Sequence, residues 1–177
     1  MSYVTMSETK TSNFSINGSS SNISNVSDKS AKIISSSMEN ASESSINVTS
    51  TYREPSSQAS AMYDNAVSKG ADSQKDLYKA AGDAVIETFE NYSPAWNCSK
   101  SEAVEAMTQT IIEQGPGNVS VHSSDPKVLN VIDIAPSSVE NKKEFHKALH
   151  NNANINKVIT PIDKPGEGAF HIEIKQK

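Results

Sequence analysis

The chain has 177 residues, enough for one domain with a core plus a tail, and a formal net charge of −5. The acidic balance argues against broad binding to nucleic-acid phosphates, which requires clustered lysine and arginine. The single cysteine, Cys98, excludes both an intrachain disulfide and a cysteine-rich zinc site.

The N-terminal segment is polar, and serine is its commonest residue. It lacks the apolar core of a signal peptide, and no apolar run in the chain is long enough to span a bilayer. Residues 1–25 carry too little apolar surface to offset the entropy cost of ordering. We therefore expect a flexible tail over 1–25 and a domain over 26–177, made in the cytoplasm and not inserted into a membrane.

Hydrophobic periodicity in the first half of the chain predicts one strand among several helices. The strand alternates over 46–51 and is followed by Pro55, which suits the first turn of a helix. Ser99 and Glu102 form a capping-box pattern at the start of the last of these helices. The predicted helices span 27–42, 55–69, 73–90 and 99–114, with a loop over 92–98.

The second half of the chain carries short, β-branched apolar runs that are typical of strands. In the last run, AFHIEI, alternate residues face opposite sides, so His171 and Glu173 share one face. Helices early in the chain and strands late in it predict an α+β fold. The predicted strands span 119–122, 128–134, 155–160 and 169–174, with a helix over 136–150.

Three side chains at or near the ends of predicted strands could converge on a metal ion: His122, Asp133 and His171. Neutral imidazoles with a carboxylate suit zinc, and a catalytic zinc needs three protein ligands and an open position for water. Such a zinc lowers the pKa of its bound water toward about 7 and so supplies a hydroxide nucleophile. Periodicity alone favours a plainer interpretation, with one buried, hydrogen-bonded histidine and two polar surface residues.

Arg53 is the only arginine among the 16 basic residues, and it directly follows a predicted strand. Its planar guanidinium can hold a carboxylate through two parallel hydrogen bonds, which lysine cannot match. A surface ion pair is an equally good interpretation of a lone arginine.

His146 and His150 are spaced i, i+4 on a predicted helix, a spacing that can bind a metal ion. The run His-Lys-Ala-Leu-His lacks the glutamate of the His-Glu-x-x-His metalloprotease motif. The sequence therefore favours a solvated helix face for this pair.

Four short motifs occur along the chain in a fixed order. They are Ser50-Thr51-Tyr52-Arg53, Ser120-Val121-His122, Ile132-Asp133-Ile134 and Phe170-His171-Ile172. Together they resemble the zinc D-Ala-D-Ala carboxypeptidase and peptidoglycan endopeptidase family. That family includes the vancomycin-resistance D-Ala-D-Ala dipeptidases and the phage L-alanyl-D-glutamate endolysins, and it shares its fold with the hedgehog signalling domain. The resemblance covers the chain from about residue 26 to the end.

The resemblance implies helices packed on a small, mainly antiparallel sheet that carries a zinc ion held by His122, Asp133 and His171. Arg53 would bind the substrate carboxylate or polarise the scissile carbonyl. The substrate would be a peptidoglycan stem peptide cleaved near a D-residue. We expect a monomer that acts at the bacterial cell wall after holin release or export by a dedicated secretion machine.

The chain departs from the family pattern at two places. The segment between His122 and Asp133 is longer than in the family, which leaves Asp125 as a rival ligand; Asp133 is preferred because Ile-Ala-Pro follows it, as in the family. The family's catalytic base stands three residues before the last histidine, where this chain has Gly168. Glu167 and Glu173 are therefore the two candidates for the proton acceptor.

The expected function is zinc-dependent hydrolysis of an amide bond in cell-wall stem peptides, by carboxypeptidase or endopeptidase action. One alternative is a non-catalytic zinc-containing module, which would bind zinc and wall fragments without releasing peptide. Another is a structural component of a phage particle with the same fold, whose function would survive the loss of His122.

Overall fold

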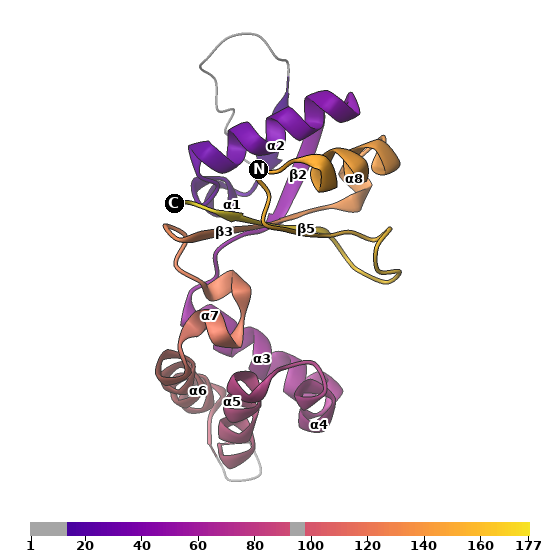
Figure 1. Cartoon of the computed structure of the whole chain (residues 1–177). Helices are drawn as coiled ribbons and strands as arrows, with labels where there is room; N and C mark the ends of the chain where they lie inside the picture. Colours follow the sequence, from indigo (N-terminus) through magenta and orange to yellow (C-terminus); the bar gives the residue numbers. More distant parts are fainter. Residues whose placement is uncertain (1–13, 93–97) are drawn as a thin grey trace. The chain divides into compact units, whose positions relative to one another are not determined.

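The computed structural model describes residues 14–92 and 98–177, and its contacts divide the chain into two compact units (Figure 1). The first, here called the sheet unit, comprises residues Met1–Tyr52 and Asp125–Lys177. The second, the helical unit, comprises Arg53–Ser124. The segment 26–177, expected to form one domain, therefore contributes to two units. The predicted α+β class is confirmed.

Five strands form one mixed sheet in the sheet unit, in the order β1-β2-β3-β5-β4. Only the β1–β2 pair is parallel, and the other three pairs are antiparallel, so the expected small, mainly antiparallel sheet is confirmed. The strands are β1 (Ser15–Gly18), β2 (Ser45–Ser50), β3 (Leu129–Ile134), β4 (Lys157–Ile159) and β5 (Phe170–Lys175).

Two helices, α2 (Asp28–Ala41) and α8 (Lys142–Asn151), pack against each other and cover one face of this sheet (Figure 1). Their buried residues form a single core with the inward residues of the strands. Period-2 alternation on β5 buries one set of side chains here and directs the other set to the opposite face. The largest fully buried side chains of this core include Ile34, Met38, Phe145, Leu149, Phe170 and Ile132.

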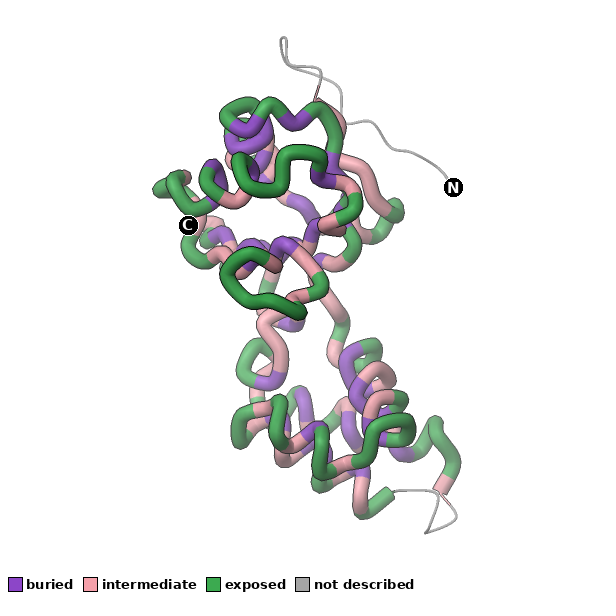
Figure 2. Tube along the Cα trace, turned by 90° about the vertical axis from the view of Figure 1, so that its right-hand side faces the viewer, coloured by how far each residue is buried: buried purple, intermediate pink, exposed green. Residues whose placement is uncertain are grey.

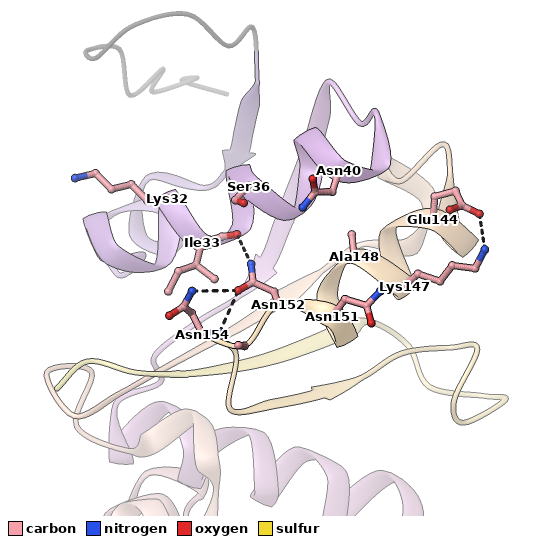
Figure 3. Close-up of a pocket in the computed structure, with 11 residues that line it drawn as sticks. Lys32, Ile33, Ser36, Asn40, Glu144, Lys147, Ala148, Asn151, Asn152 and Asn154 are labelled. Carbon is pink, nitrogen blue, oxygen red and sulfur yellow. Dashed lines mark hydrogen bonds and ion pairs between the residues drawn. The ribbon is translucent and has the colours of Figure 1, made fainter.

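A surface pocket lies where α2 meets the C-terminal end of α8 (Figure 3). Asn152, which directly follows α8, links this end of the helix to α2: its amide donates to the Ile33 carbonyl at 3.2 Å and to Ser37 Oγ at 3.0 Å. Lys32, Ser36 and other polar side chains line the pocket, and the predicted site residues are not among its lining.

Glu43 holds the start of α8 in place. Its buried carboxylate accepts hydrogen bonds from the backbone N–H groups of Glu140, at 3.1 Å, and Asn141. Glu43→Ala removes the acceptor of both donors, and an unpaired donor of this kind costs about 1–3 kcal/mol. We expect the free energy of unfolding of the sheet unit to fall by about that amount in urea titrations. Glu43→Gln, which keeps one acceptor oxygen, should lose less, and equal losses would contradict this role.

The helices of the helical unit pack around a second core. In both units, buried and exposed residues alternate along the helices (Figure 2). The capping box predicted at Ser99 and Glu102 is present. Met62, Ile86 and Met107 are fully buried in this core. The helices are α3 (Pro55–Lys69), α4 (Ala71–Lys75), α5 (Ala80–Asn91), α6 (Lys100–Gln114) and α7 (Pro116–Val119), followed by a 3-10 turn, η2 (Val121–Ser123).

Several predicted elements are confirmed, and others are wrong in part. The continuous helix over 73–90 is wrong, because α4 ends at Lys75 and α5 starts at Ala80. Tyr78 packs so closely on Gly82 that a Cβ there would lie 2.4 Å from the Tyr78 Cβ. The turn between the two helices thus brings Tyr78 against Gly82, a place where only glycine fits.

The strand predicted over 119–122 is also wrong. Gly115, with φ +81°, ends α6, and Pro116 then starts a new helical turn. Val119 is buried in the helical core and pairs with no strand. The helix predicted over 136–150 is a 3-10 turn, η3 (Pro136–Ser138), followed by α8.

Composition predicts a flexible tail through residue 25, but part of that segment forms regular secondary structure. Within it, β1 pairs with β2 and leads into a short helix, α1 (Ser20–Ser24). The sheet supplies backbone hydrogen bonds that a segment poor in apolar residues could not provide alone. Residues 1–13, and 93–97 of the predicted loop, lie outside the described residues. Among the helices of the described ranges, none is long and apolar enough to cross a membrane.

Candidate metal centre

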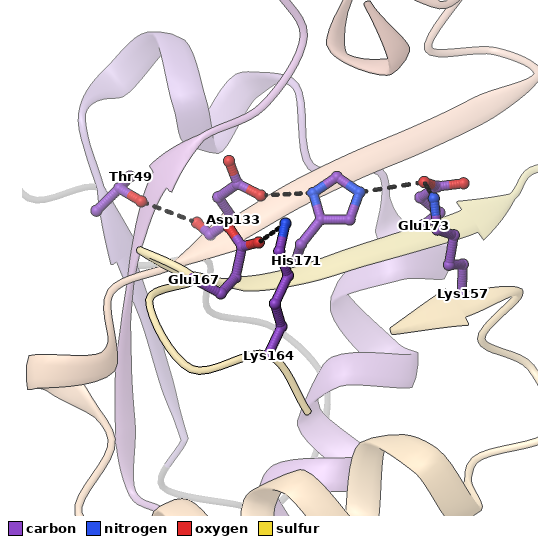
Figure 4. A network of polar contacts seen from close by, with 7 residues as sticks. All are labelled: Thr49, Asp133, Lys157, Lys164, Glu167, His171 and Glu173. Atoms are coloured by element: carbon purple, nitrogen blue, oxygen red, sulfur yellow. Dashed lines mark hydrogen bonds and ion pairs between the residues drawn. The ribbon is translucent and has the colours of Figure 1, made fainter. Parts of the chain in front are cut away.

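Asp133 on β3 and His171 on β5 are direct cross-strand partners in the antiparallel pair. Each is flanked by core residues, so both side chains lie on the sheet face opposite α2 and α8. Asp133 Oδ1 lies 2.8 Å from His171 Nδ1 (Figure 4). The register of a single strand pair therefore brings together two of the three predicted ligands.

Glu173 is hydrogen-bonded to the other ring nitrogen of His171. Its Oε1 lies 3.1 Å from His171 Nε2 and 3.0 Å from the ammonium of Lys157, its cross-strand partner on β4 (Figure 4). A carboxylate on the second nitrogen of a metal-binding histidine fixes the ring orientation and strengthens the donor. Asp133, His171 and Glu173 thus make a line of acid, imidazole and acid along one sheet face.

The pKa values of this line follow from its contacts. Burial alone would lower the pKa of His171, but hydrogen bonds with Asp133 and Glu173 outweigh it and hold that pKa above its usual value. Burial alone would raise the pKa of Glu173, but hydrogen bonds from His171 and Lys157 hold it below its usual value. Glu173 is therefore a weak proton acceptor, and its carboxylate is committed to the imidazole and the lysine.

Within the sheet unit, Asp133 and His171 could supply two ligands to one metal ion, and a second set of side chains, His146, His150 and Asp163, could bind a metal ion by itself. Two imidazoles with one carboxylate are a donor set that suits zinc. Asp133 and His171 belong to the sheet unit, whereas His122 stands in η2 of the helical unit.

Asp125, the rival ligand, belongs to neither set of the described residues. It is exposed, and its carboxylate accepts a hydrogen bond from the Lys127 N–H at 2.9 Å. Its carbonyl accepts from the Leu129 N–H at 2.9 Å. These bonds explain Asp125 as the residue that organises the turn into β3.

Arg53 and His122 meet through their backbones within the helical unit. The N–H of Arg53 donates to the carbonyl of His122 at 2.8 Å, so two of the four sequence motifs lie side by side. The guanidinium is held from α3, because Nη1 donates to Oε1 of the buried Gln58 at 3.1 Å. Gln58 also hydrogen-bonds Tyr78; burial raises the pKa of Tyr78 overall, against the lowering effect of Arg53 and Gln58.

Arg53→Lys tests whether the guanidinium fork matters. A lysine keeps the charge and the backbone bond to His122, but it cannot make two parallel hydrogen bonds to a carboxylate or carbonyl. We expect unchanged zinc content and a loss of roughly 10²-fold or more in kcat/KM on a stem peptide, comparable to the loss of one oxyanion donor. Lys69→Arg, an exposed conservative change on α3, is the matched control. Unaltered kinetics in Arg53→Lys would remove Arg53 from the site.

Glu167, the other candidate base, lies in the loop between β4 and β5. Its N–H donates to the Lys164 carbonyl at 3.0 Å. Its Oε2 lies 3.8 Å from Lys164 Nζ, and Figure 4 shows the lysine pointing to the carboxylate. Gly166, with φ +95°, and Gly168 flank it. This ion pair is longer than that of Glu173, so Glu167 is the less tightly held of the two carboxylates.

Sequence reasoning missed three supporting features of these residues. Gln58 and Lys157 hold Arg53 and Glu173, and only side-chain contacts show this. The third is an irregularity between Val48 and Ser50, where β2 gains one residue against β3 next to Asp133. Bulges of this type re-aim side chains and are common beside functional sites. The alternating sequence of this strand does not indicate the bulge.

No family model, no curated protein and no solved structure matches this chain. The assignment of function therefore rests on the residues and their chemistry. An imidazole between two carboxylates can bind a divalent cation or hold a proton. In the helical unit, the Arg53 guanidinium, held by the buried amide of Gln58, can bind an anionic group.

Proposed function

We propose that this chain is a zinc-dependent peptidase that hydrolyses an amide bond in peptidoglycan stem peptides. The observation that carries the proposal is the Asp133–His171 pair, with Glu173 on the far nitrogen of the imidazole. This is the carboxylate–histidine arrangement expected of a zinc ligand and its outer partner. His122 is proposed as the third protein ligand. The motif resemblance supports the substrate class.

The proposed chemistry assigns one role to each residue. A zinc ion held by His122, Asp133 and His171 would supply a nucleophilic water at neutral pH and a Lewis acid for the scissile carbonyl. The Arg53 guanidinium binds the substrate carboxylate or the developing oxyanion. Glu167 accepts the proton of the attacking water and returns it to the leaving amine. Glu173 is a positioning residue in this scheme, since its carboxylate already accepts from His171 and Lys157.

Two glutamate substitutions separate the proton acceptor from the positioning residue. Glu167→Gln should keep zinc and lose about 10²–10⁴-fold in kcat, the usual value of a general base. Glu173→Gln should weaken zinc affinity by about 10–100-fold, as the loss of an outer partner does, and should recover activity as zinc is added. Zinc titrations and single-turnover rates give the two readouts. Glu39→Gln, an exposed residue on α2, is the control.

If Glu173→Gln lost turnover and Glu167→Gln lost zinc affinity, Glu173 would be the proton acceptor and Glu167 the positioning residue. Full turnover in both variants would remove the acid–base scheme and favour the second candidate, a non-catalytic zinc module that binds cell-wall peptide. One observation supports that candidate: Lys157, 3.0 Å from Glu173, and His171 together hold the pKa of that carboxylate below its usual value, which makes it a poor proton acceptor.

Zinc content and peptide release test the proposed function directly. We expect about one zinc at this site and release of amino acids or peptides from purified stem peptides, which a chelator abolishes and zinc restores. Zinc binding with retention of wall fragments, but with no release of peptide, would establish the non-catalytic module instead.

A further inference from the structure

We propose that His146, His150 and Asp163 form a second site for a divalent transition-metal ion, and that this ion fastens α8 to the loop between β4 and β5. All three residues belong to the sheet unit, and none has a part in the proposed peptidase chemistry. One donor atom from each lies within 4.8 Å of the other two.

The distances in this cluster fit a shared ion. Asp163 Oδ2 lies 3.0 Å from His150 Nε2 and 3.9 Å from His146 Nδ1. Zinc–nitrogen and zinc–oxygen bonds of about 2.0–2.2 Å at tetrahedral angles place two donors about 3.4 Å apart. The two observed distances lie on either side of that value, so small side-chain rotations would bring the donors to an ion.

The two imidazoles are arranged by the helix itself. Spacing of i, i+4 puts them one turn apart on the same face of α8. Their ring centroids lie 4.5 Å apart, with an angle of 59° between the planes. The sequence favours a solvated face for this pair, but a loop from another part of the chain meets it and supplies the carboxylate.

Thr160, which is fully buried directly after β4, fixes this carboxylate. Its N–H donates to Asp163 Oδ2 at 2.9 Å, and its Oγ1 accepts from the N–H groups of Ile162 and Asp163 at 3.2 and 3.3 Å. Two acceptances use the lone pairs of this oxygen, so its hydrogen is left for His146 Nδ1, which lies 2.9 Å away and accepts it as the unprotonated ring nitrogen. A metal ion at Nδ1 would take the same lone pair in place of this hydrogen bond, without deprotonating the ring.

Imidazole and carboxylate together suit zinc, nickel or copper(II) ions and suit magnesium poorly. The position is partly open, since His150 and Asp163 are exposed and His146 is half-buried. The remaining coordination positions would be taken by water. The loop that the ion would fasten, residues 160–169, also carries Glu167, so metal at this site would restrict the motion of the segment that leads into β5.

The full-length His171→Ala variant is the background for the test, because it lacks a ligand of the proposed peptidase zinc. Zinc and cobalt(II) serve as probes, in calorimetric titration and in visible absorption of the bound cobalt. We expect one ion per chain in this background. His150→Ala added to it should weaken binding more than about 100-fold, beyond the effect of losing an outer partner alone. Lys143→Ala, also on α8 and exposed, should leave binding unchanged.

Asp163→Asn in the same background distinguishes a three-ligand site from a bare histidine pair. The amide keeps the size of the side chain but loses the anionic donor, so affinity should fall by at least about tenfold. Binding that is unchanged by Asp163→Asn or by His150→Ala would overturn the proposal. So would the absence of binding in a His171→Ala protein whose circular dichroism matches that of the parent. Failure of the peptidase proposal would leave these results unaffected, because the background already removes that site.

Discussion

Replacing His171 with alanine is expected to abolish both zinc binding at the proposed peptidase site and hydrolysis of stem peptides. His171 is the residue through which Asp133 and Glu173 are connected, at 2.8 and 3.1 Å. Without the imidazole, two carboxylates share one face of the sheet with no donor between them. A zinc site that loses one of three protein ligands is expected to bind more than about 100-fold more weakly. The rate should fall to that of the background reaction.

Metal content and single-turnover peptide release are measured together. Each protein also carries His150→Ala, which removes the second proposed metal site so that only the peptidase zinc is counted. Lys175→Ala provides the control, because Lys175 is an exposed residue on the same strand and the same face. Zinc at the parental level in His171→Ala would remove this histidine from the site. Retained zinc in the corresponding His122→Ala protein would reject His122 alone and leave the sheet pair in place.

Phe145→Ala is expected to cost the sheet unit about 3–5 kcal/mol of unfolding free energy. Phe145 on α8 is completely buried, and its ring centroid lies 5.5 Å from that of Phe170, the first residue of β5. Truncation leaves a cavity between the helix layer and the strand that carries His171. Domains are typically stable by only about 5–15 kcal/mol, so much of the unit's stability would be lost.

Chemical denaturation, monitored through the amide hydrogen exchange of β5, would measure this loss in the sheet unit separately from the helical unit. Phe145→Leu keeps most of the apolar volume and should cost clearly less than the alanine variant. Val67→Ala on α3 is the control for an apolar truncation, because Val67 is 59% exposed. A loss below about 1 kcal/mol for Phe145→Ala would mean that the helix–sheet contact contributes little.

The sequence alone predicts the elements whose patterns are strong and local. Alternation in AFHIEI yields β5 with the correct faces, because side chains in any strand point alternately to its two sides. The Ser99–Glu102 pair predicts a capping box, since both halves of that contact lie within four residues. Pro55 and Gly70 likewise mark the ends of α3. The α+β class follows from the same local patterns.

Tertiary contacts decided the elements whose local signals are weak or misleading. The segment around Val119 reads as a strand, but its valine is buried among helices, and Gly115 and Pro116 impose a helical turn. The apolar period over 73–90 includes Leu77, but Leu77 is exposed, α4 ends before it, and Tyr78 packs on Gly82 across the turn. β1 forms because its backbone pairs with the edge of β2, a strand far from it in the sequence.

The candidate site divides in the same way. Imidazole, carboxylate and guanidinium chemistry belongs to the side chains, so the candidate ligands for zinc and for an anion can be chosen from the sequence. The sequence does not reveal that Asp133 and His171 are cross-strand partners, that Glu173 contacts His171 and Lys157, or that Asp163 meets the histidines of α8. Strand register and loop placement depend on contacts between residues far apart in the chain, which no local pattern encodes.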